Sequence, residues 1–273
     1  MLVKSFYFYT LTKIMRIFYT GFFVILSFSV LSQTIVNTEK LFHDDEDGLA
    51  FASELIGSTM QGNAQLYLLE SSLNLRYKNK KHTTKLFTGG SYVNENAEVI
   101  SNSLFGQLRY NYLINSKSQF FSFYQLQTNK ILLLKSRQLI GAGYRRSLFH
   151  VGTDSTSSLK FDCSIGAMQE EENLNALELG LNDQVYSNYT RGIISAIISV
   201  KLGNGVSVVN TIYIQSKITD LSDYRLLNET NLIFEINKWL AISLDIEYRY
   251  DGDPPSVLKP SDLNTNMGFV LSL

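Results

Sequence analysis

Apolar and polar residues alternate along most of this chain, and the alternation is clearest between Trp239 and Tyr250. Successive side chains of a strand point to opposite faces, so a period of two predicts a strand with one apolar and one polar face. At roughly 3.3 Å per residue and a tilt of about 45°, such a segment is long enough to cross the ~25 Å apolar band of an outer membrane. Its apolar face carries Leu240, Ile242, Leu244, Ile246, Tyr248 and Tyr250, and its polar face carries Asp245, Glu247 and Arg249.

The same pattern predicts about twelve strands after residue 50. We expect them at about residues 51–59, 65–77, 82–92, 101–115, 119–127, 134–148, 159–168, 186–202, 206–218, 224–236, 239–250 and 263–273. Odd-numbered strands tend to lead into long connections, such as the acidic segment 170–183 and the proline-bearing segment 251–260, whereas most even-numbered strands lead into tight turns. The connection at 150–157 is longer than this rule prefers. Short turns at one end and longer loops at the other are typical of outer-membrane barrels, so we predict an all-β, antiparallel up-and-down transmembrane β-barrel.

The polar faces of these strands carry charges of both signs. An Arg turned to lipid at the bilayer midplane costs about 2 to 4 kcal/mol, so we expect the charged faces to point into the barrel. There they would leave a thin water path or fill the lumen with ion pairs. The lumen-facing candidates are Arg76, Arg109, Arg137, Asp245, Glu247 and Arg249.

A soluble barrel or sandwich with its apolar faces turned inward is the alternative architecture. Period two alone does not separate the two. The predicted strands run to about ten to fourteen residues, however, whereas strands of soluble proteins usually have about five or six. Trp239 and Tyr250 also close the two ends of one strand, where aromatic girdles lie in membrane barrels. Both features favour the barrel in lipid.

The amino terminus is predicted to be an export signal. Arg16 precedes an apolar run, 17–31, and Ser32 is a small residue at the expected cleavage site, so residues 1–32 are interpreted as a signal peptide. The apolar run falls short of the ~20 residues that a membrane-spanning helix needs. An exported chain of this pattern is expected in the outer membrane of a Gram-negative bacterium.

Three further boundaries complete the expected organisation. Met15 stands directly before Arg16, so residues 1–14 are interpreted as an extension from a misplaced start. Residues 33–50 are interpreted as a solvated leader, because the segment 33–47 is polar and ends in an acidic run. Residues 51–273 are expected to form the barrel.

Composition agrees with this class. The net charge of −1 and the absence of a polybasic run argue against a nucleic-acid partner. Charged residues make up 18% of the chain, against about 25% in an average protein, as expected where part of the surface faces lipid. The single cysteine, Cys163, excludes an internal disulfide and is expected to be a small apolar residue on a strand.

Catalytic and metal-binding signals are poor. His43, His82 and His150 lie far apart without metal-ligand spacing, so we expect no enzyme activity, cofactor or metal site. A lipid hydrolase embedded in the barrel would need a Ser and a His side by side on the lipid-facing wall. Ser147 and His150 differ in parity and are expected to point to opposite faces.

The carboxy terminus indicates how the chain would be assembled. Residues 266–273 alternate in the manner of the assembly signal of outer-membrane barrels, although Leu273 stands where bacterial examples usually have an aromatic residue. We therefore expect the barrel-assembly machinery to bind the last strand. The other expected partner is outer-membrane lipid, around a monomer.

Several short segments stand at strand ends in a characteristic order. They are Gly62-Asn63, Arg137 followed by Gly141-Ala142-Gly143-Tyr144, Ser222-Asp223-Tyr224-Arg225, and Tyr250-Asp251 leading through Pro254-Pro255 and Lys259 to Asp262. In these segments the chain from about residue 51 onward resembles the YdiY-like salt-induced outer-membrane proteins, domain-of-unknown-function family number 481. The resemblance implies an exported β-barrel and no known reaction. The chain departs from the family after the two prolines, where it has Ser256-Val257-Leu258.

The sequence thus predicts an outer-membrane barrel and leaves its role open. A narrow or ion-pair-filled pore and a structural or adhesive barrel of the stressed envelope both fit. A soluble periplasmic binding barrel and a barrel-embedded lipid hydrolase are the alternatives.

Overall fold

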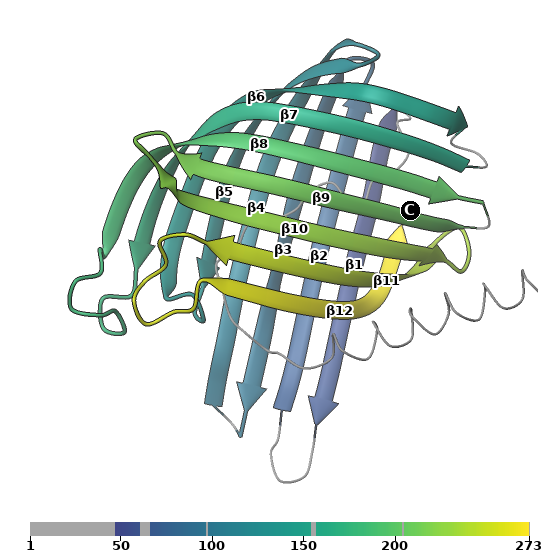
Figure 1. Ribbon diagram of the computed structural model, residues 1–273. Coiled ribbons are helices and arrows are strands. Elements are labelled where there is room, and N and C mark those ends of the chain that lie inside the picture. The colour runs from purple at the N-terminus through teal and green to yellow at the C-terminus, as the bar shows by residue number, and fades with distance from the viewer. Residues whose placement is uncertain (1–46, 61–65, 97, 154–156, 204, 273) are drawn as a thin grey trace, which may run out of the picture. The chain divides into compact units, whose positions relative to one another are not determined.

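The computed structural model describes residues 47–60, 66–96, 98–153, 157–203 and 205–272, and forms a barrel of antiparallel strands. Each strand pairs with its neighbours in sequence, and β1 pairs with β12 to close the sheet, which confirms the predicted all-β up-and-down barrel (Figure 1). The strands are β1 (Gly48–Met60), β2 (Leu66–Asn79), β3 (His82–Glu95), β4 (Glu98–Asn115), β5 (Ser118–Asn129), β6 (Leu134–Thr153), β7 (Ser157–Leu174), β8 (Tyr186–Leu202), β9 (Val206–Lys217), β10 (Asp220–Glu235), β11 (Leu240–Asp251) and β12 (Ser261–Ser272). Among these residues, no helix is long and apolar enough to cross a membrane.

Some of the sequence predictions lie outside the described residues. These are the signal peptide, most of the leader with His43, the Gly62-Asn63 segment and Leu273. The barrel begins at Gly48, so the first strand takes up the last residues assigned to the leader.

The two ends of the barrel differ in their connections. We call the end that carries the connections 130–133, 175–185 and 252–260 the loop end, and the end with the turns 80–81 and 236–239 the turn end. Gly48, where β1 begins, and Ser272, where β12 ends, both lie at the turn end. In Figure 1 the wall from β6 to β12 crosses in front of the wall from β1 to β5, as expected for strongly tilted strands.

Several of the predicted connections are wrong in length. At the loop end, β4 begins at Glu98 soon after β3 ends at Glu95, and β10 begins at Asp220 soon after β9 ends at Lys217, so these two connections are short. Two further differences concern β7 and β6. β7 continues to Leu174, so Glu170 and its neighbours belong to a strand and not to the predicted acidic loop. β6 continues to Thr153 and β7 begins at Ser157, so the connection between them is short and follows the rule for the turn end. In both places polar residues were interpreted as loop because their pairing with a neighbouring strand cannot be seen in a single sequence.

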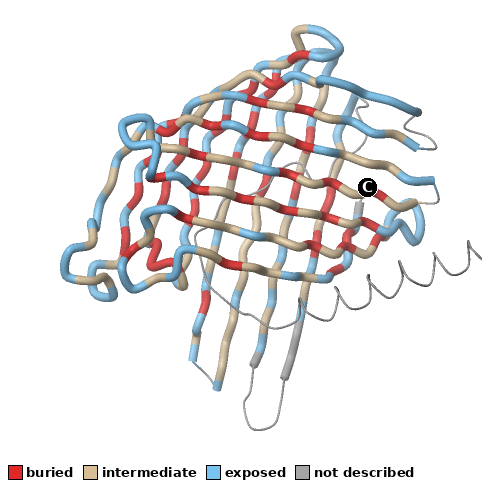
Figure 2. The backbone as a smooth tube through the Cα atoms, viewed as in Figure 1, coloured by how far each residue is buried: buried red, intermediate tan, exposed pale blue. Residues whose placement is uncertain are grey.

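Burial alternates along the strands, as Figure 2 shows by the alternation of colours along each tube. On β11, the alternate residues Ala241, Ser243 and Asp245 are buried. Tyr248, on the opposite face of the strand and nearer the loop end, is exposed. The buried face of a closed barrel is its interior. The polar face of this strand therefore points inward, and its apolar face forms part of the outer surface.

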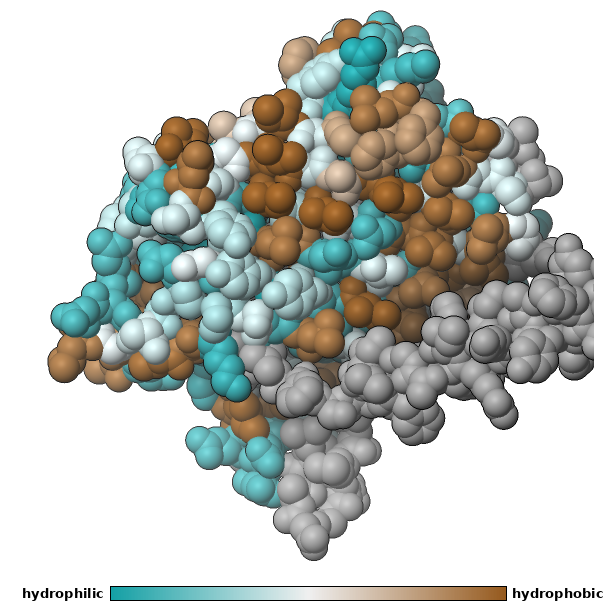
Figure 3. Space-filling model, in the orientation of Figure 1, coloured by the Kyte–Doolittle hydropathy of each residue, from teal (hydrophilic) through white to brown (hydrophobic). Residues whose placement is uncertain are grey.

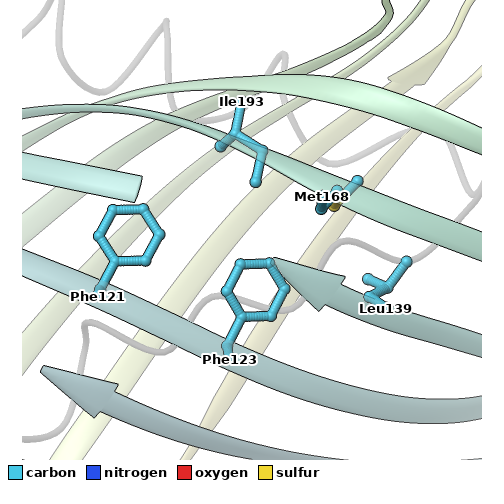
Figure 4. Packing of buried hydrophobic residues seen from close by; sticks show 5 residues of the cluster. All are labelled: Phe121, Phe123, Leu139, Met168 and Ile193. Carbon is cyan, nitrogen blue, oxygen red and sulfur yellow. The ribbon is translucent and has the colours of Figure 1, made fainter. Parts of the chain in front are cut away.

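The interior also contains an apolar cluster, which the alternation of polar faces did not predict. Its members come from four adjacent strands, β5 to β8, and lie against one another in Figure 4: Phe121, Phe123, Leu139, Met168 and Ile193. The Arg109 guanidinium lies 5.3 Å from the ring centroid of Phe121 and 5.7 Å from that of Phe123. The cluster fills part of the lumen because large side chains inside a barrel pack against each other.

Two glycines on β6 make room for these rings. A Cβ atom at Gly141 would lie 2.6 Å from Cζ of Phe123, and one at Gly143 would lie 2.5 Å from Cζ of Phe121. Both are far below a normal contact distance, so no other residue fits without movement. This explains why positions 141 and 143 of β6 are glycines.

Replacing Gly141 by Ala is therefore expected to destabilise the barrel by about 1 to 3 kcal/mol, the usual cost of overpacking. The measurement is the temperature at which the folded, faster-migrating band disappears from an SDS gel. Gly106→Ala is the matched control, because a Cβ there meets nothing nearer than Cγ2 of Thr88 at 4.0 Å. Equal behaviour of the two variants would contradict the packing argument.

Candidate functional site

A network of buried charges lies inside the barrel near the loop end. It is built from strands β6 to β11, and each of its residues stands within a few positions of the end of its strand. The cations are Arg137, Arg191, Lys217 and Arg225, and the anions are Glu170, Glu172, Asp223 and Asp251. Equal numbers of the two signs leave the network neutral, which is the condition for placing so much charge inside a protein.

Glu170 is the centre of this network. Its Oε1 accepts a hydrogen bond from Nε of Arg191 at 2.9 Å, and its Oε2 accepts one from Nη1 of Arg225 at 2.7 Å. Nε of Arg137 lies 3.8 Å from Oε2 as well. Only 1% of Glu170 is exposed. Three guanidinium groups from three different strands thus converge on one buried carboxylate.

The other carboxylates tie the same arginines to their neighbours. Arg137 donates to Glu172, and Nη2 of Arg225 lies 3.4 Å from Oε2 of the same carboxylate. Nε of Arg225 also donates to Oδ2 of Asp251 at 2.9 Å. Each link joins two different strands. The links therefore hold the strands in one relative register.

Asp223 extends the network to β9. It accepts from Nη1 and Nη2 of Arg191 at 2.8 and 3.3 Å, a bidentate pair. Nζ of Lys217 lies 3.8 Å from Oδ2 of Asp223 and 3.7 Å from the ring centroid of Tyr189. Lys217 is partly exposed, so this corner of the network borders solvent.

Of these residues, only Arg137 was among the lumen candidates taken from the sequence. Glu170 and Glu172 were missed because three consecutive glutamates resemble a solvated loop. A signal existed in the segments that carry the family resemblance: Arg137, Asp223, Arg225 and Asp251 belong to three separate segments and meet here.

The other lumen candidates lie in other parts of the interior. Arg76, Arg109 and Asp245 are buried, whereas Glu247 and Arg249 are half-buried and form an ion pair at 2.6 Å on the same strand. Glu247 also accepts a hydrogen bond from Asn264 at 3.3 Å. The candidates therefore do not form a single cluster.

A polar track runs along the inner wall from the network towards the turn end. Gln127 is the register partner of Arg137. Amide hydrogen bonds then join Gln127 to Gln125 at 2.5 Å, and Gln125 to Gln107 on β4 at 2.6 Å. Two residues further along β4 the track reaches Arg109. From there it passes through register partners on β3 and β2, Lys85 and Arg76. We call this series of residues the polar track.

Acidic residues line a different part of the inner wall. Glu229 and Glu247 are register partners on β10 and β11, and Asp245 is the register partner of Asn231 and Asn266. Glu54, on β1, is buried in the barrel interior and accepts a hydrogen bond from the hydroxyl of Ser243. The cationic stretch of the polar track lies on β2 to β4, whereas these acidic residues lie on β1, β10 and β11; Arg249 on β11 and Glu70 on β2 are exceptions.

Two of the connections at the loop end are joined by hydrogen bonds. Oδ2 of Asp183, in the connection after β7, accepts hydrogen bonds from the backbone N–H and the hydroxyl of Ser256, in the connection after β11, at 3.1 and 3.0 Å. The N–H of Gly180 donates to the same carboxylate at 2.9 Å. These hydrogen bonds, those from Ser256 first, lower the pKa of Asp183 below its ordinary value of 3.8.

The structure changes the argument about Ser147 and His150. A β-bulge between Ser147 and Phe149 shifts the register, so that Ser147 pairs with Asp162 and His150 with Lys160. The two residues therefore share a face, and the expectation that they point to opposite faces is wrong. That face is the interior one, on which Asp162 is buried, and not the outer wall that a lipid hydrolase would use.

The remaining candidates for chemistry are a metal site and the single cysteine. No group of three or more His, Cys, Asp and Glu side chains there is arranged to hold a metal ion. Cys163 is half-buried on β7, on the outward-pointing side.

Replacing Glu170 by Gln is expected to destabilise the barrel by about 3 to 5 kcal/mol, because it leaves buried arginines without their shared counter-charge. Urea unfolding in detergent, followed by intrinsic fluorescence, measures the change. Glu171→Gln is the matched control, since Glu171 is exposed on the outward face of the same strand. If both variants unfold at the same urea concentration, Glu170 does not hold the network.

Asp183→Asn is expected to release the contact between the two loops at neutral pH. A spin label on Val257, which is 55% exposed, in a Cys163→Ser background reports loop mobility. Since the pKa of Asp183 is lowered, the contact is complete above pH 3.8 and is lost in the unsubstituted chain only as the pH falls through the lowered pKa. Asp253→Asn, in the same loop, is the control and should leave the label as immobile as before.

The family model described as "Protein of unknown function, DUF481" matches residues 54–273. No protein with a curated description matches the chain. Among solved structures, the chain is similar to the translocator domain of the autotransporter NalP from Neisseria meningitidis, at 10% identity and a TM-score of 0.48, over 83% of this chain and 89% of that one. It is also similar to the NanC porin, at 9% identity and a TM-score of 0.49, over 81% and 98% of the two chains.

These structural likenesses are too remote to carry a ligand or an activity over to this chain. The family match is different in kind, because it spans nearly all of the barrel, from β1 to the end of β12. It includes the residues of the charged network. The chain belongs to the family of proteins of unknown function DUF481.

Proposed function

We propose that this protein is an outer-membrane barrel that forms a narrow pore for small ions and polar solutes. The observation that carries the proposal is the polar track, which runs inside the barrel from Arg137 near the loop end to Arg76 near the turn end. A continuous series of charged and amide side chains offers hydrogen-bonding partners to a solute along its way. A barrel built only for strength has no need of such a path.

The outer surface supports the membrane location. In Figure 3 apolar side chains cover much of the visible face, and polar ones gather towards the loops at the left of the view. Large apolar side chains on the strands are more than half exposed, among them Leu69, Leu104, Ile140, Ile165, Ile194 and Met267. Apolar patches of this extent are typical of surfaces that face lipid. A soluble barrel would have these side chains inside and the charges outside, which argues against the periplasmic binding barrel.

Aromatic residues mark both ends of the apolar surface. The rings of Tyr224 and Tyr250 lie 5.3 Å apart near the loop end. Near the turn end, His82 lies 5.2 Å from Tyr112. Tyrosine, with an apolar ring and a polar hydroxyl, is suited to the boundary between hydrocarbon and headgroups. Their positions support a membrane-spanning barrel with outer-membrane lipid as its surroundings.

The proposed orientation places the loop end outside the cell and the turn end in the periplasm. Longer loops on the outside and short turns on the inside are the rule for outer-membrane barrels. This orientation puts Gly48 and Ser272 on the periplasmic side. An exported chain reaches the outer membrane from that side, where the assembly machinery would bind its last strand.

The interior supports a narrow pore and not a wide one. The apolar cluster around Phe121 and Phe123 occupies one side of the lumen, and the charged network crosses it near the loop end. Most of the charged side chains concerned are less than 10% exposed. Large solutes would have to displace buried ion pairs, so we expect them to be excluded.

Single-channel recording in planar lipid bilayers tests the proposal. We expect small conductance steps, because the interior holds ion pairs and packed aromatic rings. Large, stable steps would contradict the narrow interior. No current at any voltage would contradict the pore and favour a structural or adhesive barrel.

Ion selectivity tests the polar track itself. Neutralising Arg76 and Arg109 together with Gln is expected to shift the reversal potential in a KCl gradient towards that of potassium, because cations are removed from the path while the acidic wall remains. Arg146→Gln is the control, since Arg146 is exposed on the outward face of β6. An equal shift in the control would show that the track does not set selectivity.

A further inference from the structure

We propose that a cavity on the outer rim of the barrel binds the phosphorylated sugar headgroup of an outer-membrane glycolipid. The cavity has a volume of about 270 Å³ and lies at the loop end, between β4, the connection from β5 to β6, and the connection after β7. Its lining combines two lysines with several amides, a hydroxyl and an apolar floor: Asn102, Thr128, Asn129, Lys130, Leu133, Leu134, Lys135 and Asn175.

The backbone around the cavity is held in place by hydrogen bonds and packing. The N–H of Lys130 donates to the carbonyl of Asn102 at 3.0 Å, and the N–H of Asn175 donates to the carbonyl of Leu133 at 2.7 Å. Leu133 has a φ of 56°, a left-handed conformation that is uncommon for leucine. Such a conformation persists only where the surroundings determine it. The cavity is therefore a built feature of the connection.

A small apolar cluster holds the connection between β5 and β6 against the end of β7. Leu132, Leu134 and Leu174 are buried against one another, and they join the connection to the end of β7. Asn129 accepts a hydrogen bond from the N–H of Leu132 at 3.2 Å, which closes the turn. The two lysines are thereby presented from a fixed backbone, although their side chains are exposed.

The position of the cavity matches the level of lipid headgroups. Thr128 is exposed near the loop end of β5, and Asn102 is exposed on β4, which continues beyond it to Glu98. The next outward-pointing residues on the same strands, Leu104 and Leu126, are apolar, with 64% and 46% of their surface exposed. The cavity thus borders the apolar surface on its loop-end side, where we place the polar part of a lipid, although Ile100 on β4, which is 40% exposed, lies beyond Asn102.

The chemistry of the lining selects the class of ligand. Lys130 and Lys135 supply positive charge for a phosphate, and Nζ of Lys130, which donates to the carbonyl of Val99 at 2.5 Å, keeps two further N–H groups for it. The side chains of Asn102 and Thr128 supply partners for sugar hydroxyls. Leu133 and Leu134 offer an apolar floor to the face of a sugar ring. The volume is near the lower end of the range of about 300 to 1,000 Å³ for small-molecule pockets, so it suits one sugar phosphate and not an oligosaccharide.

This inference rests on the proposed membrane location, and its first test measures lipid binding alone. The probe is bisphosphorylated lipid A, added to the full chain in neutral detergent, and native mass spectrometry measures how much lipid the folded barrel retains. Changing both Lys130 and Lys135 to Gln is expected to weaken retention at least about tenfold, because two charge-assisted contacts are lost. Dephosphorylated lipid A should bind the unsubstituted chain as weakly as phosphorylated lipid A binds the variant.

A matched variant separates a site from general charge attraction. Lys81 and Lys117 are exposed in turns at the opposite end, and changing both to Gln removes the same charge. Retention should then stay at the level of the unsubstituted chain. Equal loss in the two variants, or no loss in the first, would overturn the proposal.

Two further measurements identify the source of the phosphate. Inorganic phosphate should displace lipid A only poorly, because it lacks the sugar; complete displacement at millimolar phosphate would show a site for free phosphate and overturn the lipid assignment. The Lys130 and Lys135 variant should keep the single-channel conductance of the unsubstituted chain. A barrel that binds lipid A in this way but carries no current would contradict the pore while supporting the headgroup site.

Discussion

Glu170 binds three arginines inside the barrel, and this interaction requires every strand from β6 to β10 to be in its correct register. Moving any of these strands by one residue would turn its charged side chain to the outer surface and its apolar neighbour inward. The charge left behind would then be buried without a partner, at a cost of several kcal/mol. In a membrane the displaced arginine would face hydrocarbon as well. The network therefore fixes the wall against which the remaining strands close.

The interior is divided into regions with different physical roles. The charged network lies near the loop end, and the apolar cluster of Phe121, Phe123 and their neighbours packs against β6 to β8, where glycines leave space for the rings. The polar track passes beside this cluster, with Arg109 stacked over both rings. An arrangement of this kind combines rigid packing with a hydrogen-bonded path.

Much of the architecture could be predicted, and the failures have a common origin. Period two located the strands and the face of each, because a barrel turns one side of every strand to a uniform surface. Glu170 and Glu172 were assigned to a loop because their charge suggested solvent, and the arginines that neutralise them come from strands distant in sequence. The bulge after Ser147 had no sequence signal either. Strict alternation therefore assigned His150 to the wrong face of β6. The apolar cluster was missed because the phenylalanines of β5 and the glycines of β6 indicate ring packing only once the two strands are known to be paired.

The sequence by itself determined that this chain forms strands with one apolar and one charged face, and therefore on which side of a closed sheet most residues lie. That information is local, since it depends on the parity of neighbouring positions. Only the tertiary structure decided which charges meet: that Arg137, Arg191 and Arg225 share Glu170, that Asp183 reaches Ser256, and that two lysines border one cavity. Those contacts depend on register, tilt and closure of the barrel. These quantities depend on all strands together, so no single segment of the sequence predicts them.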